Sequence, residues 1–232
     1  FLEFQPQISC NTGKTAGIEA LLRWTIDGRR IPPDRFIPIL EQTGLIYDVG
    51  LWVLKNALQE HNRLVARGFQ PLRVSVNLSV VQFQEESFID DVRKIIQESG
   101  VNPKYIELEI TESLFSKDPE DVLKKLYELK ELGVRIAIDD FGKGYSSLNR
   151  LKLVPFDRIK IDKEIIDYIN LDEKKAPITQ ISILLARTFK ANVTAEGVET
   201  KDQADFLISI DCDEIQGYYY SRPLSVEALE EF

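Results

Sequence analysis

Acidic and amide side chains recur in this sequence where short apolar runs, rich in β-branched residues, come to an end. Runs of this kind are typical of the buried strands of a parallel sheet. Six of them carry or deliver polar residues, namely Glu19 with Arg23, Asn77, Glu109 with Glu112, Asp139 with Asp140, Lys160 with Asp162, and Glu196 with Glu199. Oxygen ligands therefore arrive from several separate strands, together with an ammonium group.

Carboxylates that converge on one site repel each other strongly unless cations neutralise them. Oxygen ligands without His or Cys suit hard divalent ions, so we expect Mg²⁺ or Mn²⁺ rather than a Zn²⁺ site of the His/Cys type. His61 is the one histidine of the chain, and we expect it to be a packing or surface residue of a helix. A Ser-His-Asp catalytic arrangement is therefore not predicted.

The adjacent acids Asp139 and Asp140 bear on the number of ions. Neighbours in a regular strand point to opposite faces, but both carboxylates can turn inward where the strand ends and the chain kinks. Gly142 and Gly144 allow such a kink. One carboxylate can then bridge two ions while the other binds only the second, an arrangement that activates a water for in-line displacement at phosphorus. The chemistry suggested is phosphodiester hydrolysis.

The elements that must position these residues follow a repeated order of strand, then helix. An opening strand pair is predicted at 1–10 and 16–24, joined by a turn at 11–14. Helices are predicted at 33–43, 45–67, 87–99, 119–132, 145–152, 174–189, 201–208 and 225–231, and strands at 74–78, 105–110, 134–138, 158–161, 193–195 and near 214.

A strand count near eight, with no Gly-x-Gly-x-x-Gly turn after the first strand, favours one α/β architecture over another. We expect a (β/α)8 TIM-like barrel with an irregular opening strand pair, rather than a doubly wound dinucleotide-binding fold. In such barrels the active site lies at the carboxyl ends of the strands.

Composition indicates an ordinary globular domain, 232 residues long, 44% hydrophobic and 29% charged. A net charge of -9 argues against DNA or RNA binding that depends on phosphate neutralisation. Cys10 and Cys212 have no metal-ligand spacing, and no apolar stretch reaches the ~20 residues that span a bilayer. We expect a cytoplasmic location, for the protein itself or for the cytoplasmic part of a membrane-attached protein. The strand-like pattern that begins at Phe1 suggests that residues 1–232 form one domain cut from a longer protein.

The order of motifs along the chain closely resembles the EAL-domain phosphodiesterases, which hydrolyse the bacterial second messenger cyclic di-GMP. The matching segments are Gln5-Pro6, EALLRW at 19–24, VNLS at 76–79, ELEITE at 107–112, DDFGKGYSS at 139–147, KID at 160–162, AEGVET at 195–200 and QGY at 216–218. They cover nearly the whole chain, and such an ordered series is far more specific than the three letters EAL alone.

The resemblance implies a role for each strand-end residue. Four side chains would bind a first metal ion: Glu19, Asn77, Glu109 and Asp139. Asp139 would bridge to a second ion held by Asp140. Lys160 would orient the water and offset charge at the phosphate, and Glu196 would be the general base. Two Mg²⁺ or Mn²⁺ ions per site are implied, with inhibition by Ca²⁺.

Further residues would contact the substrate, namely Gln5, Leu22, Arg23, Asp162, Glu199, Gln216 and Pro223. The guanidinium of Arg23 suits a phosphate oxygen, whereas Gln5 and Pro223 resemble guanine or ribose contacts. In relatives, a loop and its anchor couple the site to a dimer interface, and the corresponding residues here are Glu112, Phe141, Gly142, Gly144, Tyr145, Ser146 and Ser147. The implied partners are a second copy of the chain and attached sensory or GGDEF domains.

Departures from the family pattern are few, and none removes a metal ligand. Phe4 stands where Tyr is usual, Lys143 stands where Thr is commoner, and residues 25–30 lack a frequent His-Pro pair.

The function predicted is therefore a cyclic-guanylate-specific phosphodiesterase that opens cyclic di-GMP to linear pGpG with a water activated by two metal ions. The alternative is a receptor domain that binds cyclic di-GMP without turnover, although every residue that such receptors lose is present here. A metal-dependent hydrolase of another phosphodiester also fits an acidic barrel mouth. A pure interaction module leaves the convergent carboxylates unexplained.

Overall fold

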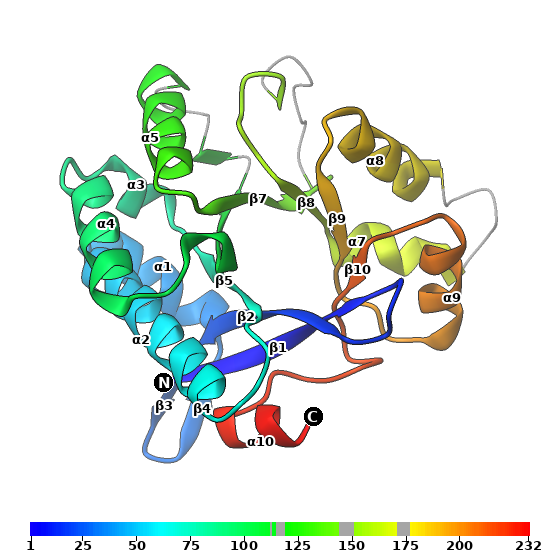
Figure 1. The fold of residues 1–232 in the computed structure, drawn as a ribbon, viewed down its shortest axis with the longest axis horizontal. Helices are drawn as coiled ribbons and strands as arrows, with labels where there is room; N and C mark the ends of the chain where they lie inside the picture. The colour runs from blue at the N-terminus through cyan, green and yellow to red at the C-terminus, as the bar shows by residue number, and fades with distance from the viewer. Residues whose placement is uncertain (112, 115–118, 144–150, 171–176) are drawn as a thin grey trace.

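The apolar runs of the sequence form the strands of a closed barrel in the computed structural model, which describes residues 1–111, 113–114, 119–143, 151–170 and 177–232. The barrel strands are β1 (Leu2–Ser9), β2 (Thr15–Leu22), β5 (Arg73–Asn77), β6 (Ile106–Thr111), β7 (Arg135–Phe141), β8 (Arg158–Ile161), β9 (Asn192–Ala195) and β10 (Glu214–Ile215). Their hydrogen-bonded order is β1, β10, β9, β8, β7, β6, β5, β2, and the ring closes there (Figure 1). The predicted TIM-like barrel is confirmed.

The opening strand makes the barrel mixed rather than wholly parallel. β1 pairs antiparallel with β2, with Gln5 opposite Glu19, and antiparallel with β10, with Ile8 opposite Ile215. The remaining neighbours pair in parallel. Because β1 runs the other way, its first half lies at the carboxyl ends of the parallel strands. We call this end of the barrel the mouth.

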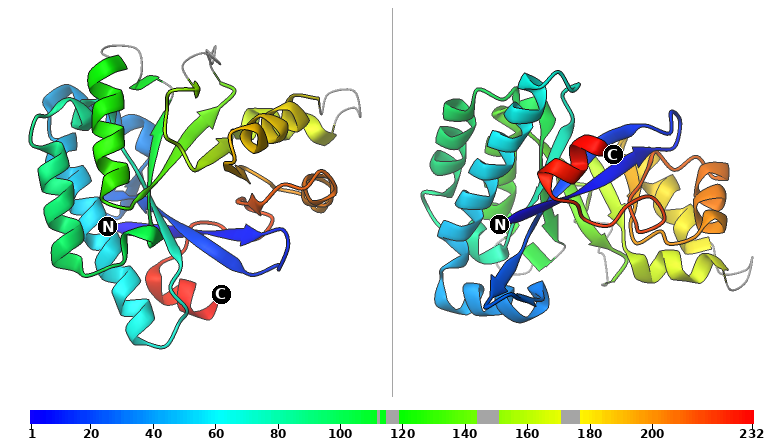
Figure 2. Two further views of the ribbon diagram at one scale, coloured as in Figure 1. Left: turned by 45° about the horizontal axis from the view of Figure 1, so that its top comes forward. Right: turned by 90° about the horizontal axis from the view of Figure 1, so that it is seen from below.

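Helices cover the outside of the barrel, because each parallel crossover must return the chain to the same edge of the sheet. The longer ones are α1 (Pro33–Thr43), α2 (Ile46–Ala66), α4 (Phe88–Ser99), α5 (Pro119–Glu131), α8 (Pro177–Thr188) and α9 (Lys201–Ser209). Figure 1 shows α2, α4 and α5 on one side of the strands and α8 and α9 on the other. Both views of Figure 2 place α10 (Val226–Glu231) next to β1, on which it packs.

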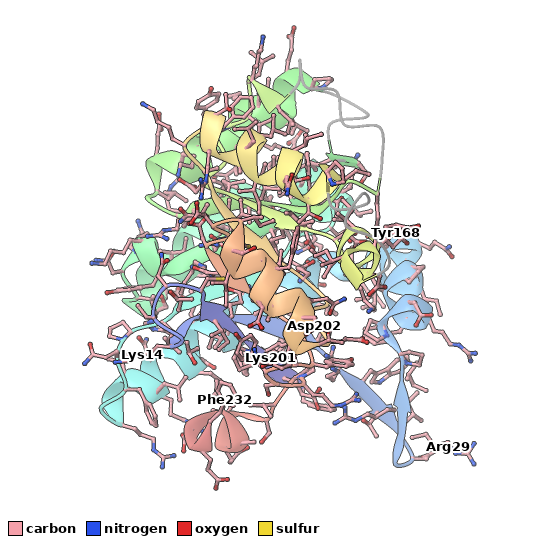
Figure 3. The ribbon with its side chains drawn as sticks, turned by 90° about the vertical axis from the view of Figure 1, so that its right-hand side faces the viewer. Lys14, Arg29, Tyr168, Lys201, Asp202 and Phe232 are labelled. Atoms are coloured by element: carbon pink, nitrogen blue, oxygen red, sulfur yellow. The ribbon has the colours of Figure 1, made fainter. Side chains whose placement is uncertain are left out.

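Some short elements escape the sequence periodicity. They include the helices α3 (Val80–Gln84) and α7 (Lys163–Ile166), and a hairpin of β3 (Trp24–Ile26) and β4 (Arg29–Ile31). The hairpin extends away from the barrel, with Arg29 beside its turn (Figure 3). Most of the helix predicted at 145–152 lies outside the described residues. No helix among those described is long and apolar enough to cross a membrane.

The strands alternate between an apolar outer face and a polar inner face. On β8, Ile159 and Ile161 pack outward against the helices, whereas Arg158 and Lys160 point into the barrel, and all four are almost fully buried. His61 is buried on α2 beside the ring of Tyr105, with ring centroids 5.8 Å apart, so it is a packing residue as predicted. A barrel interior is more often filled by branched apolar side chains, so its polarity here calls for a functional explanation.

Candidate active site

Lys160 lies at the centre of the mouth and is 1% exposed. Its ammonium nitrogen lies 2.6 Å from Glu109 Oε2 and 2.7 Å from Glu196 Oε1. Asp139 Oδ1 is 3.3 Å away and Glu19 Oε2 is 3.5 Å away. We call these four acids the carboxylate cluster. β2, β6, β7 and the residue after β9 each contribute one member, so the barrel brings together residues that are far apart in the sequence.

Two amide groups orient Glu19, one through each carboxylate oxygen. Asn77 Nδ2 donates to Oε1 at 2.7 Å, and Gln216 Nε2 donates to Oε2 at 2.6 Å. Gln216 Nε2 also donates to Gln5 Oε1 at 3.2 Å. The structure therefore places five of the predicted residues, Gln5, Glu19, Asn77, Lys160 and Gln216, in one connected group.

The carboxylate cluster holds more negative charge than one ammonium can neutralise, and the pKa values reflect this. Burial, reinforced by the charge of Glu19, raises the pKa of Glu109 well above its ordinary value. Burial also raises the pKa of Asp139, and that of Glu196 to about 8, in both cases against the opposing charge of Lys160. For Glu19 burial is outweighed by Lys160, Gln216 and Asn77, so its pKa is lowered. The cluster is thus an electrostatic site that favours added positive charge.

The second acid of the Asp-Asp pair lies at a bulge in β7. The register with β8 shifts between Ile138 and Phe141, and Asp140 adopts a left-handed φ of 54°. The kink predicted at Gly142 and Gly144 therefore begins two residues before Gly142, at Asp140 itself. Lys143 Nζ bridges Asp140 Oδ1 and Asp162 Oδ2, each at 2.8 Å. Asp139 thus joins the carboxylate cluster, whereas Asp140 pairs with Lys143 beside it.

The donor set fits a hard divalent cation, although no group of three or more His, Cys, Asp or Glu among the described residues forms a ready-made metal cage. The ammonium of Lys160 lies among the carboxylates instead. One carboxylate oxygen in the cluster, Glu109 Oε1, is buried without a hydrogen-bond donor among the described residues. Buried oxygens of this kind are costly unless a cation or a donor reaches them. The residues therefore suit Mg²⁺ or Mn²⁺.

Two pockets adjoin the carboxylate cluster. One, of about 300 Å³, is lined by Gln5, Glu19, Lys163, Glu196, Gly197, Glu199, Gln216, Gly217 and Tyr218. The other, of about 290 Å³, has a mostly apolar wall, includes Leu22, Arg23 and Asn77, and reaches α1, α2 and Gln82. Five of the predicted substrate residues line one pocket or the other, namely Gln5, Leu22, Arg23, Glu199 and Gln216.

Several of the predicted substrate residues also form hydrogen bonds or ion pairs within the protein. Arg23 Nε donates to Glu3 Oε2 at 2.8 Å. Asp162 caps α7 through the backbone N–H of Glu164, and Glu199 pairs with Lys163 at 3.1 Å. Pro223 lines neither of these pockets. The next residue, Leu224, forms backbone hydrogen bonds with Phe4 of β1.

The predicted coupling loop is described only at its start. Phe141 is buried in the core, and Gly142 has a φ of 100°. A Cβ atom on Gly142 would lie 2.1 Å from Ile165 Cδ1 on α7. The other members of that set, Glu112, Gly144, Tyr145, Ser146 and Ser147, lie outside the described residues.

Sequence reasoning missed a second layer of polar side chains, deeper in the barrel. We call it the floor network, and its members are Gln7, Arg73, Ser75, Glu107, Arg158, Thr194 and Glu214. Arg73 and Arg158 each form ion pairs with both Glu107 and Glu214. Three charged members of the floor network stand two residues before a residue of the mouth, namely Glu107 before Glu109, Arg158 before Lys160 and Glu214 before Gln216, and Arg73 stands four residues before Asn77. That period of two inside apolar runs is the signal that could have found them.

Comparison with known proteins agrees with this arrangement. A family model of the EAL domain matches residues 1–223. The bifunctional diguanylate cyclase/cyclic di-GMP phosphodiesterase MucR of Pseudomonas aeruginosa is 38% identical over 98% of this chain. The cyclic di-GMP phosphodiesterase NbdA of the same organism is 38% identical over 100% of this chain, and the signaling protein YkoW of Bacillus subtilis is 40% identical over 100%. This chain spans 33%, 30% and 29% of the lengths of MucR, NbdA and YkoW respectively.

A solved structure of the MucR phosphodiesterase in complex with c-di-GMP shares the fold. It has a TM-score of 0.93 at 38% sequence identity, and the match covers 99% of this chain and 93% of that one. With its barrel, its ordered motifs and a family model that spans nearly its full length, this chain belongs to the EAL domain family.

Proposed function

We propose that this domain hydrolyses cyclic di-GMP to linear pGpG, and that the carboxylate cluster around Lys160 performs the reaction. The observation that carries the proposal is the convergence of four acids from four strands on one buried ammonium at the barrel mouth. Relatives of the same family, MucR and NbdA, are named cyclic di-GMP phosphodiesterases.

The predicted ligands, Glu19, Asn77, Glu109, Asp139 and Asp140, would hold two Mg²⁺ or Mn²⁺ ions. Such ions supply positive charge and Lewis acidity at a phosphate. Glu109 Oε1 favours this role because it is a buried oxygen that lacks a donor among the described residues.

Lys160 and Glu196 would together orient the attacking water and accept its proton. Glu196 Oε1 lies 2.7 Å from Lys160 Nζ, so one water can contact both groups. Lys160 donates to that water or to a phosphate oxygen, and Glu196 accepts the proton as the water oxygen bonds to phosphorus. The bond from phosphorus to one ribose oxygen would break in line, and that oxygen would take up a proton from Glu196 or from solvent water, which leaves a terminal phosphate and a ribose hydroxyl.

Two pockets, one lined by Glu19 and Glu196 and the other by Arg23 and Asn77, offer space for a ligand with two similar halves. Each measures about 300 Å³, and the substrate carries two guanosine units joined by two phosphodiesters. Gln5 and Gln216 offer amide groups to a base or ribose on one side, and Arg23 lies on the other.

The purified domain, incubated with cyclic di-GMP and Mg²⁺, should release pGpG that chromatography resolves from the substrate. Ca²⁺ should permit substrate binding without turnover, because its longer and looser coordination misplaces the reacting groups. Binding without product in Mg²⁺ would indicate the receptor alternative, and turnover in Ca²⁺ at the Mg²⁺ rate would contradict the two-ion arrangement.

A further inference from the structure

Glu19 is connected to the floor network by a chain of hydrogen bonds whose direction is determined at one end. Arg73 NH2 donates to Gln7 Oε1 at 2.6 Å. A guanidinium can only donate, so the oxygen of the Gln7 amide must face Arg73. The nitrogen of that amide then points toward the mouth.

The orientation of the Gln7 amide in turn determines the orientation of the Gln216 amide. Gln7 Nε2 donates to Gln216 Oε1 at 2.9 Å. This bond uses the oxygen of Gln216, so Gln216 Nε2 faces the mouth and donates to Glu19 Oε2 at 2.6 Å. In the reversed orientation, the oxygen of Gln216 would face a carboxylate, and two acceptors would meet. Gln7 is 0% exposed and Gln216 is 4% exposed, so water does not compete for these groups.

Arg73 is itself held in place by the floor network. Its guanidinium pairs with Glu214, and its Nε lies 3.0 Å from Glu107 Oε1. Gly17 on β2 leaves the space that the contact between Arg73 and Gln7 needs. A Cβ atom at position 17 would lie 2.7 Å from both Arg73 NH2 and Gln7 Oε1.

We infer that Arg73, Gln7 and Gln216 form a directional relay that orients the carboxylate of Glu19, with Gln7 and Arg73 acting as positioning residues. The consequence for metal binding rests on the proposed function, whereas the orientation of the amides does not. Groups that hold a metal ligand in place typically account for about 10- to 100-fold in metal affinity.

Two measurements on Gln7→Met test the relay. Methionine keeps the length and volume of glutamine but cannot donate to Gln216. In the metal-free protein, the side-chain NH2 protons of Gln216, followed by NMR, should exchange with water at least about tenfold faster than in wild type. Mn²⁺ affinity, measured by calorimetry without substrate, should fall about 10- to 100-fold.

Thr194→Val is the matched control, because it removes a buried hydrogen bond from Arg158 NH1 in the same floor network without touching the relay. It should leave both readouts within about twofold. If Gln7→Met does not fold, Gly17→Ala disturbs the same contact and should shift both readouts in the same direction.

The relay would be overturned if a folded Gln7→Met or Gly17→Ala variant kept both the Gln216 amide exchange rate and the Mn²⁺ affinity of wild type. Fast exchange of the Gln216 amide in the wild-type protein would overturn it as well. If wild type binds no Mn²⁺, the proposed function loses its metal site, and the exchange measurement alone decides whether the relay exists.

Discussion

At the scale of single residues, charge balance determines the protonation of the mouth. Lys160 contacts four carboxylates, and the pKa of this lysine is raised well above its ordinary value because those acids outweigh the cost of burial. The lysine therefore stays charged. Burial raises the pKa of Glu196 to about 8 in the cluster without added cations, and cations bound beside it would lower that pKa and leave a carboxylate able to accept a proton.

Glu196→Gln separates proton transfer from metal binding, because the amide keeps the size of the side chain but is not basic. Loss of a general base typically costs about 10² to 10⁴ in rate, so kcat should fall by that factor with little change in the affinity for cyclic di-GMP. Steady-state kinetics and binding in Ca²⁺ measure the two quantities. A fall of less than tenfold in kcat would remove Glu196 from the proton-transfer role.

Lys143, which stands where the resemblance makes Thr commoner, places an ammonium beside Asp140. Its ammonium bridges Asp140 and Asp162, so it competes for the carboxylate predicted to hold the second ion. Partly exposed ion pairs contribute about 0.2 to 1 kcal/mol each. Because Lys143 forms two such pairs, Lys143→Thr should lower the Mn²⁺ concentration needed for half-maximal activity by about 2- to 30-fold.

Lys201→Thr controls for the change in net charge. Lys201 begins α9 on the surface, where it pairs with Asp205 and no residue of the mouth (Figure 3). A metal requirement that is equal in Lys143→Thr and wild type would show that Lys143 does not oppose the second ion.

At the scale of elements, local sequence periodicity predicted most strands and helices, because the apolar faces of β8 and α2 repeat at the spacing of their structures. The opening strand pair was predicted, whereas the bulge at Asp140 and the antiparallel pairing of β1 with β10 were not, since these two depend on pairing between distant strands. The mouth residues were predicted because strand ends converge in any barrel. The floor network was missed because each member, taken alone, resembles an ordinary polar residue in a strand.

The close packing of the end of β7 against α7 requires that Gly142 carry no side chain. Gly142→Ala tests this requirement. A left-handed φ costs a residue with a side chain about 1 to 2 kcal/mol, and the clash of the new Cβ atom with Ile165 adds about 1 to 3 kcal/mol. Gly28→Ala, in the hairpin turn, is a matched control with a φ of 75° and no atom within 4 Å of the added Cβ. Urea denaturation should show a larger loss of unfolding free energy for Gly142→Ala, and equal losses would contradict the close contact with Ile165.

At the scale of the whole molecule, one barrel holds two polar layers with different purposes. The floor network pairs two arginines with two glutamates and is balanced, whereas the mouth carries an excess of carboxylates. A balanced layer stabilises itself, and an unbalanced one requires cations from outside. We therefore expect the floor network to support the barrel and the mouth to carry the proposed chemistry.

The initial rate of pGpG formation by Glu19→Ala and Asp139→Ala in saturating Mg²⁺ tests the central claim, that the carboxylate cluster performs phosphodiester hydrolysis. Both residues lie at the mouth of the barrel rather than in its apolar core. We therefore expect each variant to melt cooperatively, like wild type, and to lose nearly all turnover. A cooperatively folded variant of either kind that keeps a substantial part of the wild-type rate would contradict the assignment of the site.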